Sequence, residues 1–167
     1  QGKNSAFLVT GGMDARVFKS PDRGKTWTVY STPIVKGTPG SGIFSIAMFD
    51  DKNGVIVGGN YEKPEERNNT FAMTSDGGMN WSLGARLRGY RSGVAYLEKQ
   101  TIVAVGTNGT DISYDRSLLW ENIGSESLNA VAAKGKNAVW AVGPSGIVMR
   151  LNPSSLINQY ADLDLKK

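Results

Sequence analysis

Residues 20–27, SPDRGKTW, recur in altered form as residues 74–81, TSDGGMNW, and as residues 113–120, SYDRSLLW. Each copy has a hydroxyl residue, then Asp two positions later, then several turn-forming residues and a Trp. The offset from Asp to Trp is five in all three copies. Self-similarity of this kind is the signature of a repeat architecture. The chain is therefore best described as copies of one structural unit.

A second set of equal spacings shows that the unit is larger than the Asp-to-Trp motif. A small residue opens an apolar run thirteen positions before a glycine in three places, which are Ser45 and Gly58, Gly93 and Gly106, and Ala130 and Gly143. The runs before these glycines, 54–57, 102–105 and 139–142, are rich in β-branched or aromatic residues and too short for helices. They are expected to be buried strands.

Each unit of about 40 residues thus predicts four short antiparallel strands, A to D, with the Asp motif in the turn between strands C and D. This pattern predicts an all-β fold, a β-propeller with about four blades. The expected units are 5–31, 42–84, 91–123 and 127–160 within one domain, 1–167. The first unit is expected to lack strand A, because no chain precedes Gly11 by thirteen residues. In the last unit, Asn152 stands in place of the Asp.

Composition excludes several kinds of function. The 167 residues contain no Cys and no His, which removes thiol chemistry and the commonest metal ligand, and no metal site or cofactor is expected. The net charge of +4 is too small for a dedicated nucleic-acid binder. No run of eighteen apolar residues is present, so no transmembrane segment is expected. A Cys-free β-domain fits a periplasmic or extracellular protein.

The first motif copy resembles the Asp-box, or BNR repeat, which is found in sialidases, sortilin-type receptors, some glucanases and the photosystem II assembly and stability factors (Ycf48-like). It matches that pattern in full through Ser20, Asp22, Gly24, Thr26 and Trp27. The spacing to the Val-Gly-x-x-Gly segments at 105–109 and 142–146 resembles the Ycf48-like group most. The resemblance covers nearly the whole chain. It implies a C-terminal portion of a ring of six or seven blades, which would need roughly 250 to 300 residues.

The Asp-box residues are expected to build turns and to take no part in catalysis. A carboxylate can accept backbone N–H groups, a glycine can adopt positive φ, and a Trp can lie between neighbouring sheets. The third copy has Ser117 and Leu119 where the pattern has Gly and Thr, so its turn is expected to be distorted. In the second and third copies the residues with this structural role are Asp76, Gly78, Trp81, Asp115 and Trp120.

Blade topology places the longest charged segments opposite the Asp motifs. The B–C loop 60–69 and the D–A connections 32–42 and 83–92 leave the sheets at one face, where binding usually resides. Arginine with tyrosine suits recognition of a carboxylate or peptide, because a guanidinium can bind an acid through two hydrogen bonds. A solvated loop with internal ion pairs is the alternative. The expected binding residues are Tyr61, Arg67, Arg86, Arg88, Tyr90 and Arg91.

The sequence therefore predicts a non-catalytic protein-binding or assembly propeller that holds an acidic or peptide segment of a partner. The alternative is an Asp-box glycoside hydrolase of sialidase type, or a module that binds a glycan. Hydrolysis needs two carboxyl groups about 5 to 9.5 Å apart, and Asp motifs on different blades are expected to lie farther apart. A third expectation concerns assembly: another chain, or a segment upstream of Gln1, completes the ring.

Overall fold

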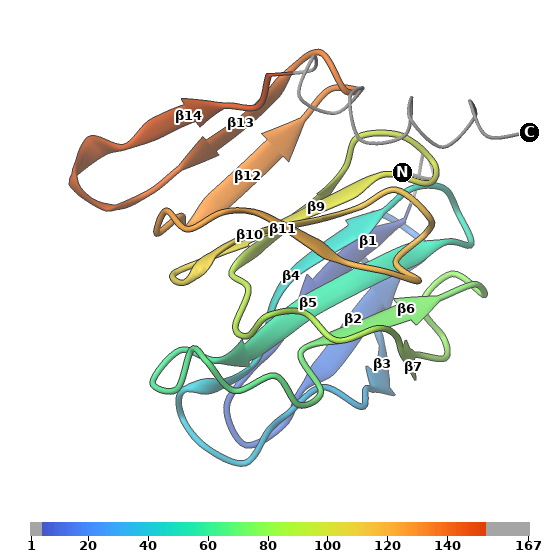
Figure 1. Cartoon of the computed structure of the whole chain (residues 1–167). Helices are drawn as coiled ribbons and strands as arrows, with labels where there is room; N and C mark the ends of the chain where they lie inside the picture. The colour runs from blue at the N-terminus through green and yellow to red at the C-terminus, as the bar shows by residue number, and fades with distance from the viewer. Residues whose placement is uncertain (1–4, 153–167) are drawn as a thin grey trace, which may run out of the picture.

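The computed structural model describes residues 5–152, which form four antiparallel sheets of three or four strands (Figure 1). The first sheet contains β1 (Ala6–Val9), β2 (Arg16–Ser20) and β3 (Thr28–Ser31). The second contains β4 (Ser41–Met48), β5 (Gly54–Asn60), β6 (Phe71–Thr74) and β7 (Ser82–Leu83). The third contains β8 (Gly93–Tyr96), β9 (Ile102–Gly106), β10 (Gly109–Ser113) and β11 (Glu121–Gly124). The fourth contains β12 (Ala130–Ala133), β13 (Val139–Val142) and β14 (Val148–Arg150), with a single 3₁₀ turn, η1 (Pro144–Gly146).

The sheets follow one another side by side, and their innermost strands are neighbours. Strand β4 packs against β8, and β8 packs against β12, while β1 packs against β4. Within each sheet the strands are adjacent in chain order and antiparallel. This is the arrangement of consecutive propeller blades, so the predicted all-β fold of blade units is confirmed. The predicted unit boundaries stay a prediction, and the last part of the fourth unit, 153–160, lies outside the described residues.

The glycines at or near the end of the second strand of a unit, such as Gly106 and Gly143, are required by close backbone approach. A Cβ atom at Gly106 would lie 2.2 Å from the backbone oxygen of Tyr90, and one at Gly143 would lie 2.3 Å from that of Ser127. Both distances are far below van der Waals contact. The glycine at the end of each thirteen-residue spacing therefore marks the point where the connection to the first strand of the unit passes close to the end of the second strand.

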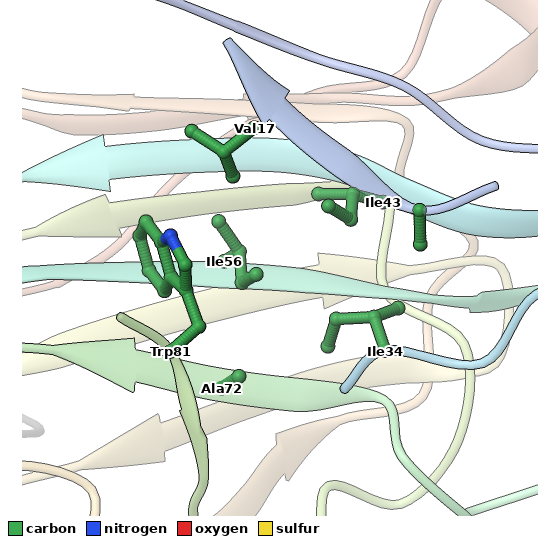
Figure 2. Close-up of a cluster of buried hydrophobic side chains, with 7 residues drawn as sticks. Val17, Ile34, Ile43, Ile56, Ala72 and Trp81 are labelled. Carbon is green, nitrogen blue, oxygen red and sulfur yellow. The ribbon is translucent and has the colours of Figure 1, made fainter. Parts of the chain in front are cut away.

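The hydrophobic core lies between the sheets. In the cluster between the first and second sheets, Trp81 and Ile56 face Val17 of β2 (Figure 2). A second cluster joins the second sheet to the third through Phe71 and Ile102. Each fully buried side chain of this size contributes roughly 1.5–3 kcal/mol to stability. Because the clusters lie between neighbouring sheets, the blades stabilise one another in series.

One strand differs from its prediction. The apolar run of the second unit opens at Ser45 in the sequence, but β4 begins at Ser41, and its pairing with β5 shifts register between Ile43 and Ser45. Phe44 is thus the extra residue of a β-bulge, which redirects its side chain. The bulge lies at the end of the sheet from which the predicted binding loops leave.

Candidate functional site

Two connections form what we call the loop face, the B–C loop 61–70 and the D–A connection 84–92. The B–C loop, green in Figure 1, projects from the end of the sheet where β5 finishes. The backbone oxygen of Pro64 accepts hydrogen bonds from the Tyr90 N–H at 2.9 Å and from the Asn108 Nδ2 at 2.8 Å. The two segments are therefore fastened to each other and to the third sheet.

A fully buried ion pair holds the D–A connection from beneath. The Arg91 Nη2 lies 2.6 Å from the Asp111 Oδ2, and neither side chain is exposed. The Arg91 Nε donates to the same oxygen at 3.0 Å, and the Arg91 Nη1 donates to the Tyr90 backbone oxygen at 2.8 Å. Burial lowers the pKa of the Arg91 guanidinium, and the Asp111 charge opposes that shift. Arginine stays protonated throughout the ordinary pH range.

Asp111 also fixes the backbone of the connection. Its Oδ2 accepts a hydrogen bond from the Arg88 backbone N–H at 3.1 Å, and its Oδ1 accepts one from the Asn122 Nδ2 at 3.4 Å. Arg91 was expected to face a partner directly, and the structure corrects this, because its guanidinium is buried and bonded within the chain. Arg91 is a positioning residue for Arg88.

Three exposed arginines of the loop face have no carboxylate partner among the described residues. The side chains of Arg67, Arg86 and Arg88 are exposed, and within residues 5–152 they form no ion pair. The acidic residue Glu66 is paired with Lys63 at 3.4 Å. Residues 83–92 contain three arginines and no acidic residue. This segment therefore carries positive charge and no acidic residue of its own, while the exposed Glu62 and Glu65 lie on the neighbouring B–C loop.

Three aromatic rings lie next to this charge. Phe44 contacts Tyr90 edge-on with ring centroids 4.8 Å apart, and it contacts Tyr61 in the same way at 6.1 Å. Tyr61 is half exposed, at 49%, whereas Tyr90 is buried. Burial, followed by the neighbouring Tyr61, raises the pKa of the Tyr90 hydroxyl. Tyr90 thus supports the cluster from within, and Tyr61 is the ring that can meet a partner.

Sequence reasoning missed Asp111, Asn108 and Phe44. Asp111 was detectable in principle. It is the one charged residue in 109–113, a run that pairs with a buried strand, and a buried charge requires a partner. Its partner Arg91 could not be read from the sequence, because Arg91 lies twenty residues away on the D–A connection and not on a strand that pairs with β10. Phe44 carried no signal, since its position depends on a bulge.

The three Asp motifs lie at the opposite end of the sheets and form what we call the Asp turns, residues 20–27, 74–81 and 113–120. In the first, the Asp22 Oδ1 accepts the Thr26 N–H at 2.8 Å and the Asp22 Oδ2 accepts the Thr26 hydroxyl at 2.8 Å. In the second, the Asp76 Oδ1 accepts the Asn80 N–H at 3.0 Å and the Asp76 Oδ2 accepts the Asn80 Nδ2 at 2.7 Å. These bonds lower the pKa of the Asp76 carboxyl to about 2.

The third Asp turn keeps the backbone of the first. Arg116 and Ser117 have φ of 62° and 67°, close to the 62° and 89° of Arg23 and Gly24. The expected distortion of this backbone is therefore wrong. What changes is side-chain bonding: the indole N–H groups of Trp27 and Trp81 donate to carbonyl oxygens, whereas the buried Trp120 Nε1 has no partner within residues 5–152.

The described part of the chain holds no group of three acidic residues that could bind a metal ion. Within the same residues no helix is long and apolar enough to cross a membrane.

Comparison with solved structures identifies the fold. The chain is similar to part of YCF48 bound to a D1 peptide, with 17% identity, a TM-score of 0.56 and coverage of 86% of this chain and 49% of that one. The fold is that of part of a β-propeller. It is also similar to the GH74 enzyme of Niastella koreensis, with 16% identity, a TM-score of 0.65 and coverage of 91% of this chain and 27% of that one. The GH74 xyloglucanase of Xanthomonas campestris gives 13% identity, a TM-score of 0.62 and coverage of 91% and 28%.

No protein-family model and no curated protein matches the chain. The chain spans about half the length of the YCF48 structure and just over a quarter of the GH74 enzymes. At these identities the similarity establishes the fold alone, because one fold hosts many functions.

Proposed function

We propose that the chain is a non-catalytic protein-binding propeller module whose loop face holds an acidic or peptide segment of a partner. The observation that carries the proposal is the set of exposed and unpaired guanidinium groups of Arg67, Arg86 and Arg88. The solved YCF48 structure, which has a similar fold, contains a D1 peptide. A partner carboxylate is the group that these arginines fit best.

The loop face is built for binding without much rearrangement. The Arg91–Asp111 pair and the bonds to the Pro64 oxygen fix the backbone around Arg88, so a partner does not have to order this segment. Preorganisation of this kind increases affinity because less entropy is lost on binding. Tyr61 adds a rigid ring with a polar end beside the charges, which is typical of binding surfaces.

The test is charge reversal at exposed positions only. An acidic peptide carrying a fluorophore is titrated with the wild-type chain and with the Arg86→Glu/Arg88→Glu variant, and we expect affinity to fall at least tenfold. The matched control is Lys25→Glu/Lys134→Glu, which makes the same change in charge at exposed residues near the opposite end of the sheets. Arg91 is left intact, because its substitution would disturb the core. Equal loss in both variants would contradict a local site.

A glycoside hydrolase is the second candidate, favoured by the similarity to GH74 enzymes. Such chemistry needs two carboxyl groups about 5 to 9.5 Å apart across a substrate site. The acidic residues of the loop face come from one loop, and Glu66 is held by Lys63. We expect no release of reducing sugar from xyloglucan; turnover that depends on Glu62 or Glu65 would replace the binding proposal.

We further propose that the Asp turns are Asp-boxes with a structural role, and that additional blades complete the ring. Support for the second point comes from both ends of the series of sheets. Leu8 and Val29 of the first sheet are 56% and 47% exposed, and Trp140 and Val148 of the fourth are 49% and 63% exposed. Between blades, such side chains are normally covered by a neighbour. Another chain, or a segment upstream of Gln1, would supply that cover.

A further inference from the structure

A cavity on the side of the Asp turns, away from the loop face, has no part in the function proposed above. It has a volume of about 550 Å³ and lies between the second and third sheets, with Asp76 of the second Asp turn and Asp115 of the third among its lining residues. The volume falls within the range of small-molecule sites, about 300–1,000 Å³. The question is which chemical class of ligand its lining would accept.

One wall of the cavity is aromatic. Phe49 and Tyr96 line it, with ring centroids 5.4 Å apart and planes inclined by 59°. Phe49 is 37% exposed, so part of its ring is available for contact. Burial raises the pKa of the Tyr96 hydroxyl to about 12. At ordinary pH this hydroxyl is therefore neutral and can both donate and accept hydrogen bonds.

In the third Asp turn one carboxylate oxygen lacks the side-chain donor that the first two turns provide. In the first two turns a side chain of the turn itself donates to the Asp Oδ2, from Thr26 or from Asn80. Leu119 takes that position in the third turn and has no donor in its side chain. The Ser113 hydroxyl at 2.8 Å and the Leu119 N–H at 3.0 Å both donate to the Asp115 Oδ1, so the Asp115 Oδ2 lacks the side-chain donor that this position supplies in the other two turns.

The charge of the lining is balanced. Asp76 and Asp115 are matched by Lys99 and Arg116, so neither an acidic nor a basic ligand is favoured by net charge. The turn backbone is also occupied, because the N–H groups of Met79 and Leu119 donate to the Asp carboxylates. A peptide would therefore find no free main-chain N–H groups at these positions. What the cavity offers is side-chain donors and acceptors beside an aromatic wall.

We propose that this cavity binds a short neutral saccharide. A sugar ring presents an apolar C–H face, which packs against aromatic rings, and hydroxyl groups, which both donate and accept. The Phe49 and Tyr96 rings meet the first requirement. The Asp115 Oδ2 and the Lys99 ammonium meet the second, and a neutral ligand leaves the balanced charges undisturbed.

The test uses four neutral hexasaccharides, cellohexaose, laminarihexaose, maltohexaose and chitohexaose, titrated into the chain by calorimetry. At least one should bind with a Kd below about 10 mM. Two variants keep Asp115 in place. Phe49→Ala removes part of the aromatic wall, and Leu119→Asn supplies a side chain that competes for the Asp115 Oδ2, as Asn80 does for Asp76. Each should weaken binding at least tenfold.

Two controls separate this site from the rest of the molecule. Thr26→Asn places an Asn at the equivalent position of the first Asp turn, outside the cavity, where it exchanges one donor to Asp22 for another, and it should leave saccharide binding unchanged. Arg86→Glu/Arg88→Glu should also leave it unchanged, which separates failure of this proposal from failure of the loop-face proposal. Absence of binding by all four sugars, or binding that Phe49→Ala and Leu119→Asn do not alter, would overturn the proposal.

Discussion

Arg91 and Asp111 form the one fully buried ion pair among the described residues. Removing two charges from water costs several kcal/mol per ion, and only close geometry with additional hydrogen bonds offsets that cost. Here two bonds join the pair, at 2.6 and 3.0 Å, and the Tyr90 oxygen, Asn108 and the Arg88 N–H satisfy further groups. The pair therefore holds the backbone of the D–A connection in place at the loop face. It stabilises the chain only when both residues are present.

We expect Asp111→Asn to destabilise the chain by about 3–5 kcal/mol, because it leaves the Arg91 charge buried without a counter-charge. Urea denaturation followed by tryptophan fluorescence measures this loss. Replacing both residues by apolar ones, Arg91→Met/Asp111→Leu, should cost less than the two single changes added together. A loss below about 1 kcal/mol for Asp111→Asn would show that water reaches the pair.

At the scale of the element, the Asp turns show how much the sequence could predict. The positions of the turns and the strands around them followed from equal spacings, because each unit repeats the same hydrophobic runs and turn residues. The backbone of the third turn did not follow, since Ser117 adopts the left-handed conformation that a glycine adopts in the other two turns. The Asp115 Oδ2 lacks the donor found in the other two turns because Leu119 has no polar atom in its side chain.

The second Asp turn makes stability depend on pH. The pKa of Asp76 is about 2 in the folded chain and 3.8 in the unfolded one, since the bonds from Asn80 favour the carboxylate. Its stabilising contribution is complete above the unfolded value and is lost as pH falls through the folded value. Asp76→Asn should therefore lower the Tm at neutral pH, and the difference from wild type should shrink as pH falls from about 4 to about 2.

Thermal melts of both proteins across this range test the dependence. Asp51→Asn serves as the control, because it removes an exposed carboxylate outside the Asp turns. A difference in Tm between wild type and Asp76→Asn that is the same at low and neutral pH would exclude the carboxylate as its cause.

At the scale of the whole molecule, the sequence predicted the series of blades but not how the loop face is arranged. The repeated sequence pattern reveals the blades because each blade buries its strands against the neighbouring blades. The burial of Arg91 and Tyr90 depends on how the B–C loop of one blade crosses the next, and no spacing encodes that contact. The six predicted binding residues are therefore divided, with Arg67, Arg86, Arg88 and Tyr61 exposed and the other two buried.

The uncovered sheets at the two ends lead to a prediction about association. Exposed apolar surface of this kind favours contact with a matching surface, and in a solution of the chain alone only another copy can provide it. We expect the sedimentation coefficient to rise with protein concentration, and Val148→Glu to reduce that rise. A chain that stays monomeric up to about 100 μM would contradict completion of the ring by a second copy.

The central claim is that the loop face is the binding surface, and amide hydrogen exchange with and without an acidic peptide tests it most directly. We expect slower exchange in residues 61–70 and 84–92 when peptide is bound, with the Asp turns unchanged. The Tyr90 and Arg88 N–H groups should change least, because they already donate to the Pro64 oxygen and to the Asp111 carboxylate without peptide. Protection confined to the Asp turns, or no protection at saturating peptide, would contradict the claim.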